Sequence, residues 1–73
     1  MINVDYKKRI RDLRQENDLT QEFVARNVLG ISQTMYARYE RGANEMPIRH
    51  LISLSKYYQV TTDFILALTD KRN

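Results

Sequence analysis

Residues 19–42, LTQEFVARNVLGISQTMYARYERG, carry two helical patterns joined by a short turn, and this stretch decides the fold. Thr20 is a residue type that caps helices, and an apolar stripe follows it until Gly30, where a helix is expected to end. Ser32 is a second capping residue, and Gly42 marks the expected end of the helix that it begins. The stretch therefore predicts two short helices in close succession.

The apolar residues of these two helices favour a close crossing. The first helix carries the small residue Ala25 between Val24 and Val28, and the second has Tyr36 and Tyr39 as its inner positions. Two helices with a small residue at the crossing and a tight turn are typical of a helix-turn-helix. The second helix of this motif fits the major groove of DNA, where its first residues meet base edges. The N-terminal amides of the first helix are suited to phosphate.

Further helices are expected on both sides of this motif. Asn3 or Asp5 is expected to cap a first helix. Its inner face consists of Tyr6, Ile10 and Leu13. Pro47 suits the first turn of a fourth helix, in which Leu54 lies beside the expected inner stripe. That stripe consists of Ile48, Leu51, Ile52, Ser55 and Tyr58.

A fifth helix completes the prediction. Thr61 is expected to cap it, with Asp63 near its positive end. Its apolar residues are Phe64, Ile65, Leu66 and Leu68. No segment shows sustained alternation of apolar and polar residues, so the sequence predicts an all-α domain of five short helices.

Length and composition limit what the chain can do. With 73 residues, it has room for one domain, expected over residues 1–70, with a short, frayed polar tail at 71–73. It has no Cys and one His, so no disulfide, metal site or cofactor is expected. No secretory or membrane-spanning segment is recognisable, and a cytoplasmic location is expected. A catalytic pair of base and nucleophile is also missing, which excludes an enzyme.

Several segments resemble the Cro/CI-type helix-turn-helix family, also called the xenobiotic-response-element family of phage repressors and small bacterial regulators. The resembling segments are Leu19-Thr20-Gln21, Val24-Ala25, Gly30-Ile31-Ser32-Gln33 and Arg38-Tyr39-Glu40-Arg41-Gly42, followed by residues 51–54 and 60–66. The resemblance runs from about Tyr6 to Asp70. It implies a five-helix, lambda-repressor-like DNA-binding domain with its helix-turn-helix at helices two and three. It also implies a transcriptional regulator, most simply a repressor, that binds double-stranded DNA as a dimer on a (pseudo)palindromic operator.

The resemblance also assigns roles to residues of the motif. The base-reading residues would be Gln33, Thr34, Met35 and Arg38. The residues that contact the DNA backbone would be Gln21, Ser32, Arg41 and Asn44. The side chains suit these roles, because Gln pairs well with adenine, Arg with guanine, and Thr meets a hydrogen-bonding edge or a thymine methyl. The alternative is that they are ordinary exposed helix residues, and for Met35 the two alternatives are equally weighted.

In the resembling family, the positions of Arg14 and Glu40 commonly form an ion pair between helices one and three. We therefore expect Arg14 to be structural and its basic neighbours in the run from Lys7 onward to be solvated. A membrane-surface helix is a less favoured interpretation of this run, because the domain core needs its apolar face.

The sequence departs from the family pattern at three places. Val28-Leu29-Gly30 carries one extra residue, which predicts a longer second helix or a wider turn. Tyr36 stands where the family has a compact aliphatic residue, and the loop before Pro47 is one residue longer than the family pattern. These features resemble a subgroup of small regulators from Gram-positive bacteria and their mobile elements.

Other interpretations concern partners. A homodimer is expected, with Thr61, Phe64, Ile65 and Leu68 as its candidate surface, although these residues could equally form the core. An antitoxin-like or anti-repressor module that binds a protein partner is the alternative function. No small-molecule effector domain is expected in so short a chain. His50 is expected at the surface or half-buried, and Phe23 either packs under the first helix or extends an interface.

The formal net charge of +3 is only mildly basic. Two of the DNA-contact candidates are cationic, namely Arg38 and Arg41. The other main candidates, Gln21, Gln33 and Thr34, are polar and neutral. Because polar groups and helix N-termini also supply DNA contacts, the weak charge does not exclude DNA binding. It predicts modest non-specific affinity for one copy and tight operator binding only when two copies pair.

Overall fold

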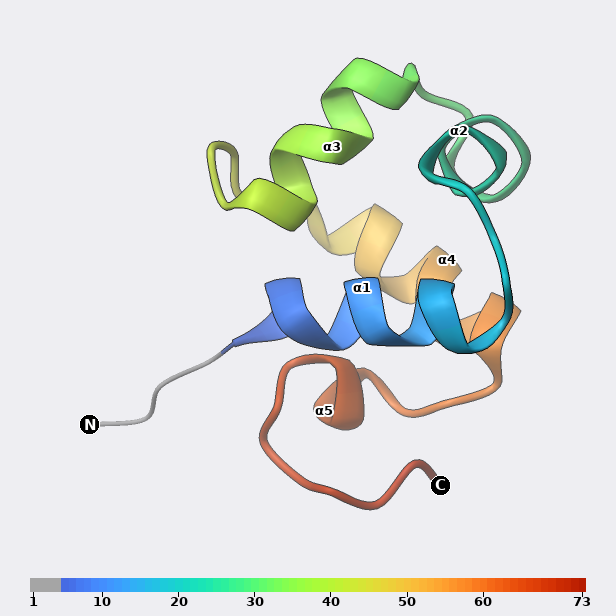
Figure 1. Cartoon of the computed structure of the whole chain (residues 1–73). Helices are drawn as coiled ribbons and strands as arrows, with labels where there is room; N and C mark the ends of the chain where they lie inside the picture. Colours follow the sequence, from blue (N-terminus) through green and yellow to red (C-terminus); the bar gives the residue numbers. More distant parts are fainter. Residues whose placement is uncertain (1–4) are drawn as a thin grey trace.

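The structure, a computed structural model, describes residues 5–73, and within that range every regular element is helical. The elements are α1 (Tyr6–Glu16), α2 (Gln21–Phe23), the π-helix η1 (Val24–Leu29), α3 (Gln33–Arg41), α4 (Ile48–Tyr58) and α5 (Thr62–Ile65). Because η1 continues α2 without a break, the two form the second of five helical segments (Figure 1). The prediction of an all-α fold with five helices is confirmed. In the part of the chain that the structure describes, no helix is long and apolar enough to cross a membrane.

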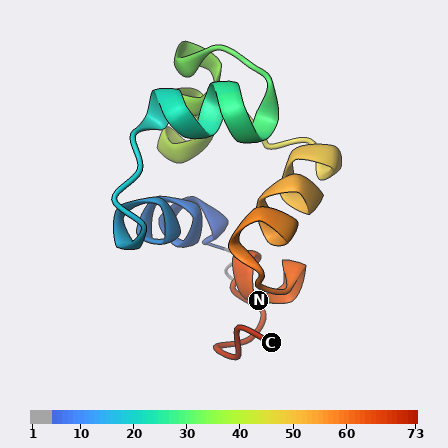
Figure 2. The same cartoon turned by 90° about the vertical axis from the view of Figure 1, so that its right-hand side faces the viewer.

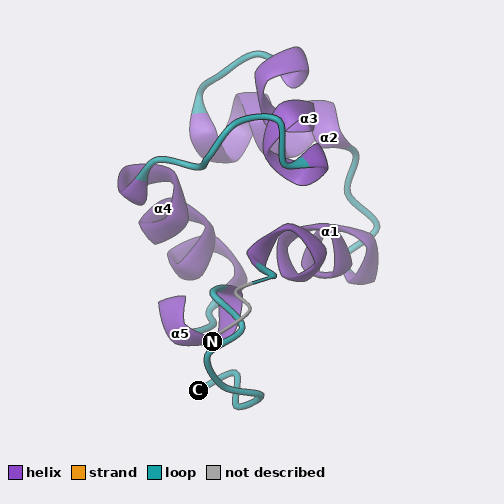
Figure 3. Ribbon diagram, turned by 90° about the vertical axis from the view of Figure 1, so that its left-hand side faces the viewer, coloured by secondary structure: helices purple, strands orange, loops and turns teal. Residues whose placement is uncertain are grey.

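The helices stack in an order that leaves the helix-turn-helix at one end of the molecule. α1 and α4 lie in the middle, with α2 and α3 above them, whereas α5 and the C-terminal residues lie below (Figures 2 and 3). α1 contacts α3 on one side and α5 on the other. The end that carries α3 is therefore free of the C-terminal segment.

The helix boundaries follow from capping side chains. The hydroxyl oxygen of Thr20 accepts a hydrogen bond from the Phe23 amide at 3.0 Å, and that of Ser32 accepts one from the Met35 amide at 3.2 Å. Thr61 caps α5 in the same way. Asp5 is the N-cap of α1, whereas Asn3, the other predicted cap, lies outside the described residues.

The extra residue near Gly30 lies inside the second helical segment. The Gly30 amide donates to the carbonyl of Ala25, five residues earlier, and the Ile31 amide donates to the same oxygen at 2.8 Å. Hydrogen bonds of this span widen the helix into a π-helix, which holds one more residue than an α-helix of the same length. Gly30 then ends the segment with φ of 67°, a conformation that glycine adopts without strain. Of the two predicted outcomes, a longer helix is the one that occurs.

The core joins all five helical segments around Tyr36. Its buried apolar residues are Ile10, Leu13, Val24, Ala25, Tyr36, Tyr39, Leu54, Val60, Phe64 and Ile65. Tyr36 has no solvent-exposed surface and is the largest of the fully buried side chains. Tyr36 stands where the family has an aliphatic residue, and its aromatic ring likewise belongs to the core. Its place on the inner stripe of α3 predicts this.

The predicted inner stripe of α4 is wrong at two positions. Ile48 is 74% exposed and Ile52 is 43% exposed, while Leu54 and His50 face the core. His50, expected at the surface or half-buried, is only 5% exposed and packs its ring against Tyr39 at a centroid distance of 5.9 Å. The reason is that apolar residues surround most of α4, so periodicity alone does not select the face that packs.

The predicted polar tail contacts the domain at Arg72. Its carbonyl accepts a hydrogen bond from the Thr61 amide at 2.9 Å, and its guanidinium binds both carboxylate oxygens of Glu16 at 2.9 Å. Arg9 and Arg72 also lie over the ring of Phe64, at 4.3 and 5.1 Å from its centroid. The last residues therefore cover the α5 side of the core.

Replacing Arg72 with alanine is expected to cause only a small loss of stability, because the Glu16 pair is half exposed. The hydrogen bonds from Arg72 lower the pKa of Glu16. A lowered carboxyl pKa means that this contribution is complete above the pKa of an unfolded Glu and is lost as pH falls through the folded one. Thermal melts of both proteins should therefore approach each other in acid and in high salt, whereas a gap that is unchanged under both conditions would contradict the ion-pair explanation.

Candidate nucleic-acid interface

Three of the four predicted base-reading residues lie on the exposed surface at the start of α3. The side chains of Gln33, Thr34 and Arg38 are exposed, while Met35 is half-buried and packs against the core. Met35 therefore presents only part of its side chain to solvent. All three belong to α3, which begins after Ser32 and lies beside α2 at one end of the molecule (Figure 1).

Gln33 is oriented by a hydrogen bond to the other helix of the motif. Its side-chain nitrogen donates to the amide oxygen of Gln21 at 2.9 Å. Gln21 in turn donates to Glu40 Oε1 at 3.1 Å, so its amide is held from both sides. The predicted phosphate contact and the predicted adenine reader are thus one connected unit.

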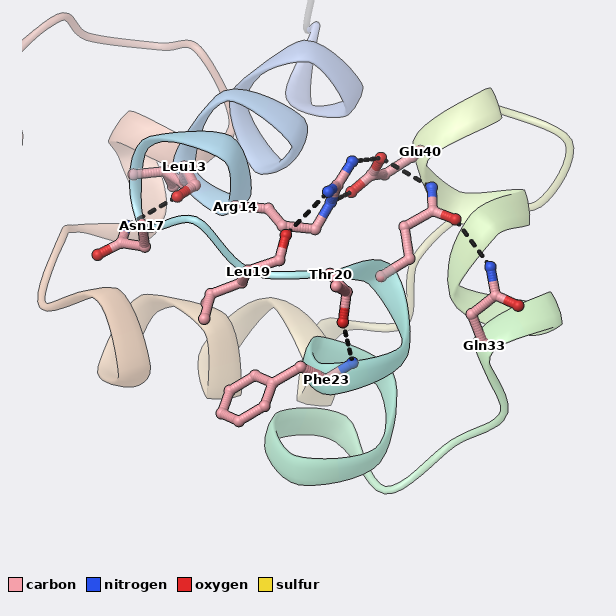
Figure 4. A network of polar contacts seen from close by, with 9 residues as sticks. Leu13, Arg14, Asn17, Leu19, Thr20, Phe23, Gln33 and Glu40 are labelled. Carbon is pink, nitrogen blue, oxygen red and sulfur yellow. Dashed lines mark hydrogen bonds and ion pairs between the residues drawn. The ribbon is translucent and has the colours of Figure 1, made fainter.

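This unit is fixed by an ion pair between α1 and α3. Arg14 Nε donates to Glu40 Oε2 at 2.7 Å, and Nη2 donates to Oε1 at 3.0 Å (Figure 4). The third nitrogen of the guanidinium, Nη1, donates to the carbonyl of Leu19 at 3.0 Å. The two side chains are only 14% and 5% exposed. Arg14 therefore ties α3 both to α1 and to the chain that enters α2.

Burial and hydrogen bonding shift the pKa of Glu40 in opposite directions. Burial of the carboxylate raises its pKa, but the hydrogen bonds from Arg14 and Gln21 and the nearby Tyr36 hydroxyl outweigh this, and the pKa lies below its ordinary value. Tyr36 influences this charge by proximity, since its hydroxyl does not reach hydrogen-bond geometry with any described residue. Burial in turn raises the pKa of the Tyr36 phenol. At neutral pH the pair is therefore ionic and the phenol is neutral.

The remaining predicted backbone contacts differ in their availability. The Ser32 hydroxyl oxygen accepts the capping hydrogen bond from the Met35 amide, and its O–H remains available to donate to a phosphate. Arg41 is exposed at the end of α3, and Asn44 is half-buried in the following loop.

Sequence reasoning missed Arg11. It lines a cleft together with Gln21 and Arg41, whereas the sequence interpretation treated it as one more solvated charge of α1. Its spacing of three residues from Arg14 is the signal that would have found it, because residues three apart share a helix face.

The candidate dimer surface needs correction. Phe64 and Ile65 are 6% and 0% exposed, so they belong to the core rather than to a free surface. Arg9 and Arg72 cover Phe64, which explains its burial. Thr61 and Leu68 remain exposed, with Leu68 at 49%.

The fold and this surface define a class of protein, namely a helix-turn-helix protein with polar side chains at the start of its second motif helix. The helix-turn-helix family model matches residues 10–65 of the chain, which therefore belongs to this family, the Cro/CI-type regulators.

Two relatives carry regulator names. The chain is 38% identical over 65 residues to YobD of Bacillus subtilis (strain 168), named as an uncharacterised HTH-type transcriptional regulator; the match covers 89% of this chain and 57% of YobD. It is 40% identical over 55 residues to RstR of Vibrio cholerae, named as a cryptic phage CTXphi transcriptional repressor, with coverage of 75% and 49%. The chain thus spans about half the length of these relatives.

Solved structures agree on the fold. A transcriptional regulator from Listeria innocua superimposes with a TM-score of 0.84 at 21% identity, over 90% of this chain and 61% of that one. The P22 c2 repressor protein, crystallised in complex with the synthetic operator 9T, superimposes with a TM-score of 0.73 at 26% identity. That match covers 89% of this chain and 96% of the repressor.

Proposed function

We propose that this chain is a sequence-specific, double-stranded DNA-binding transcriptional regulator, most simply a repressor. The observation that carries the proposal is the linked pair of Gln21 and Gln33, which places two polar side chains from both motif helices at one exposed end. The operator complex of the structurally similar P22 c2 repressor supports it. Occupation of an operator would then exclude RNA polymerase.

The residues divide by chemistry into base readers and backbone contacts. The amide of Gln33 suits adenine and the guanidinium of Arg38 suits guanine, while Thr34 offers a hydroxyl and a methyl group. The exposed part of Met35 adds apolar contact. The backbone contacts are Gln21, Ser32, Arg41 and Asn44. Gln21 thus positions the motif while its partner Gln33 reads the sequence.

A dimer on a two-fold symmetric operator completes the proposal. A copy of the chain carries few cationic DNA contacts, so tight binding needs two copies. Thr61 and Leu68 are the exposed part of the candidate dimer surface. Two half-sites would then lie about 34–36 Å apart, one helical turn of DNA.

Selection of bound duplexes from a random pool tests this function. We expect a recurring, palindromic sequence, and we expect affinity to fall steeply as salt rises. Replacing Arg38 with alanine should relax the preference at one base pair by about 1–3 kcal/mol, measured by competition among single-base operator variants. Arg26→Ala is the matched control, because Arg26 is an exposed arginine of η1 outside the proposed contacts. Absence of duplex binding at low salt would refute the proposal.

A protein-binding module is the second candidate. It is favoured by exposed aromatic side chains on α2 and α4, since Phe23 is 38% and Tyr57 46% exposed, with ring centroids 6.5 Å apart. Phe23 thus packs beside α4 and keeps an open face. Replacing both residues with serine should leave operator binding intact if the chain acts on DNA alone, and should abolish a protein complex if it acts as an antitoxin-like module.

A further inference from the structure

A cleft between α1 and α3 contains one arginine, Arg11, to which no DNA contact has been assigned so far. Its volume is about 350 Å³, and its lining residues are Arg11, Arg14, Gln21, Ala37, Glu40 and Arg41. The charges of Arg14 and Glu40 cancel in their ion pair. The net charge of the cleft therefore comes from Arg11 and Arg41.

These two arginines are free to bind a ligand. Both are exposed, and among residues 5–73 neither side chain forms a hydrogen bond or an ion pair with another residue. The lining residue of α3 one turn before Arg41 is Ala37, whose small side chain leaves the cleft open. Two guanidinium groups that line one cleft from separate helices suit a phosphate group.

The cleft lies along the same face of α3 as Gln33. Gln33, Ala37 and Arg41 are spaced four residues apart, so they follow one another along a helix face. Gln21, which bonds to Gln33, lines the same cleft. A DNA strand that passes Gln21 beside the base-reading face would therefore meet the cleft next.

We propose that Arg11 and Arg41 together bind one backbone phosphate of the operator in this cleft. The proposal rests on the proposed function and extends it, because it adds a contact from α1, outside the helix-turn-helix. The neutralised pair of Arg14 and Glu40 forms the floor and sets the distance between the two helices. Binding through both helices would fix how deeply α3 enters the groove.

Replacing Arg11 with glutamine tests the contact. We expect roughly a tenfold loss of operator affinity, as for one charged hydrogen-bonded contact. The slope of log affinity against log salt should become shallower by about 0.9 for each occupied half-site, with unchanged sequence preference. Lys56→Gln is the matched control, since it removes the same charge from an exposed site on α4 away from the cleft lining. Unchanged circular dichroism melts would show that both variants remain folded.

Operators with a single neutral methylphosphonate identify the phosphate. At one backbone position, the methylphosphonate should weaken operator binding by the wild type. It should leave binding by Arg11→Gln and Arg41→Gln unchanged, since these variants have already lost the contact. If Arg11→Gln loses no more affinity than Lys56→Gln, or if no position shows this pattern, the cleft contact is overturned while the DNA function stands. If the wild type binds no duplex at all, the proposed function fails first, and the cleft contact fails with it.

Discussion

Replacing Arg14 with alanine is expected to lower the free energy of unfolding by about 3–5 kcal/mol, because it leaves the Glu40 carboxylate buried without its ionic partner. The carbonyl of Leu19 loses its side-chain donor in the same variant. A domain of this length has a total stability of roughly 4–11 kcal/mol, so the variant would lose a large part of it. Urea denaturation followed by circular dichroism measures the difference.

Arg11→Ala is the control, since it removes the same side chain one turn earlier from an exposed position, where a change of about 0.5 kcal/mol or less is expected. The pH dependence gives a second check. Because the pKa of Glu40 is lowered, the pair stabilises the fold fully above the pKa of an unfolded Glu and loses this contribution as pH falls through the folded value. The two stability curves should therefore approach each other in acid. A loss below about 1 kcal/mol at neutral pH would mean that the pair acts as an ordinary surface ion pair.

The Arg14–Glu40 ion pair illustrates a contact that local sequence patterns do not predict. Caps at Thr20, Ser32 and Thr61 are predictable because each depends on a local hydrogen bond between a side chain and an amide three residues on. Arg14 and Glu40 are 26 residues apart, and only the family resemblance suggested them as partners. The contact of Gln21 with Gln33 escaped prediction because each residue was considered by itself for its role toward DNA.

Packing between helices determines two features that local sequence patterns did not predict, namely the place of the extra residue before Gly30 and the buried face of α4. The extra residue before Gly30 fitted either a longer helix or a wider turn, and the π-helix keeps Ala25 buried at the crossing while absorbing that residue. On α4, His50 was expected at the surface or half-buried, yet its ring is buried and packs against Tyr39. An imidazole is apolar on its faces, so a polar residue type does not by itself define the exposed side of a helix.

The second large effect is expected at Tyr36. Replacing it with alanine should cost about 3–5 kcal/mol, because a fully buried ring is removed from the centre of the core and leaves a cavity. Tyr36→Phe keeps the ring and removes only the hydroxyl. That hydroxyl is buried without a hydrogen-bond partner among the described residues, so its removal also removes an unpaired polar group.

The phenylalanine variant should therefore lie within about 1 kcal/mol of the wild type, or be slightly more stable, in the same denaturation experiment. Tyr58→Phe is the parallel case, since its hydroxyl is also buried without a partner. A loss of 2 kcal/mol or more, roughly the worth of a hydrogen bond to a charged group, would instead show that the Tyr36 hydroxyl donates to Glu40 in solution. Tyr36 would then stabilise the ion pair directly, and its hydroxyl as well as its shape would help to hold α3 in place.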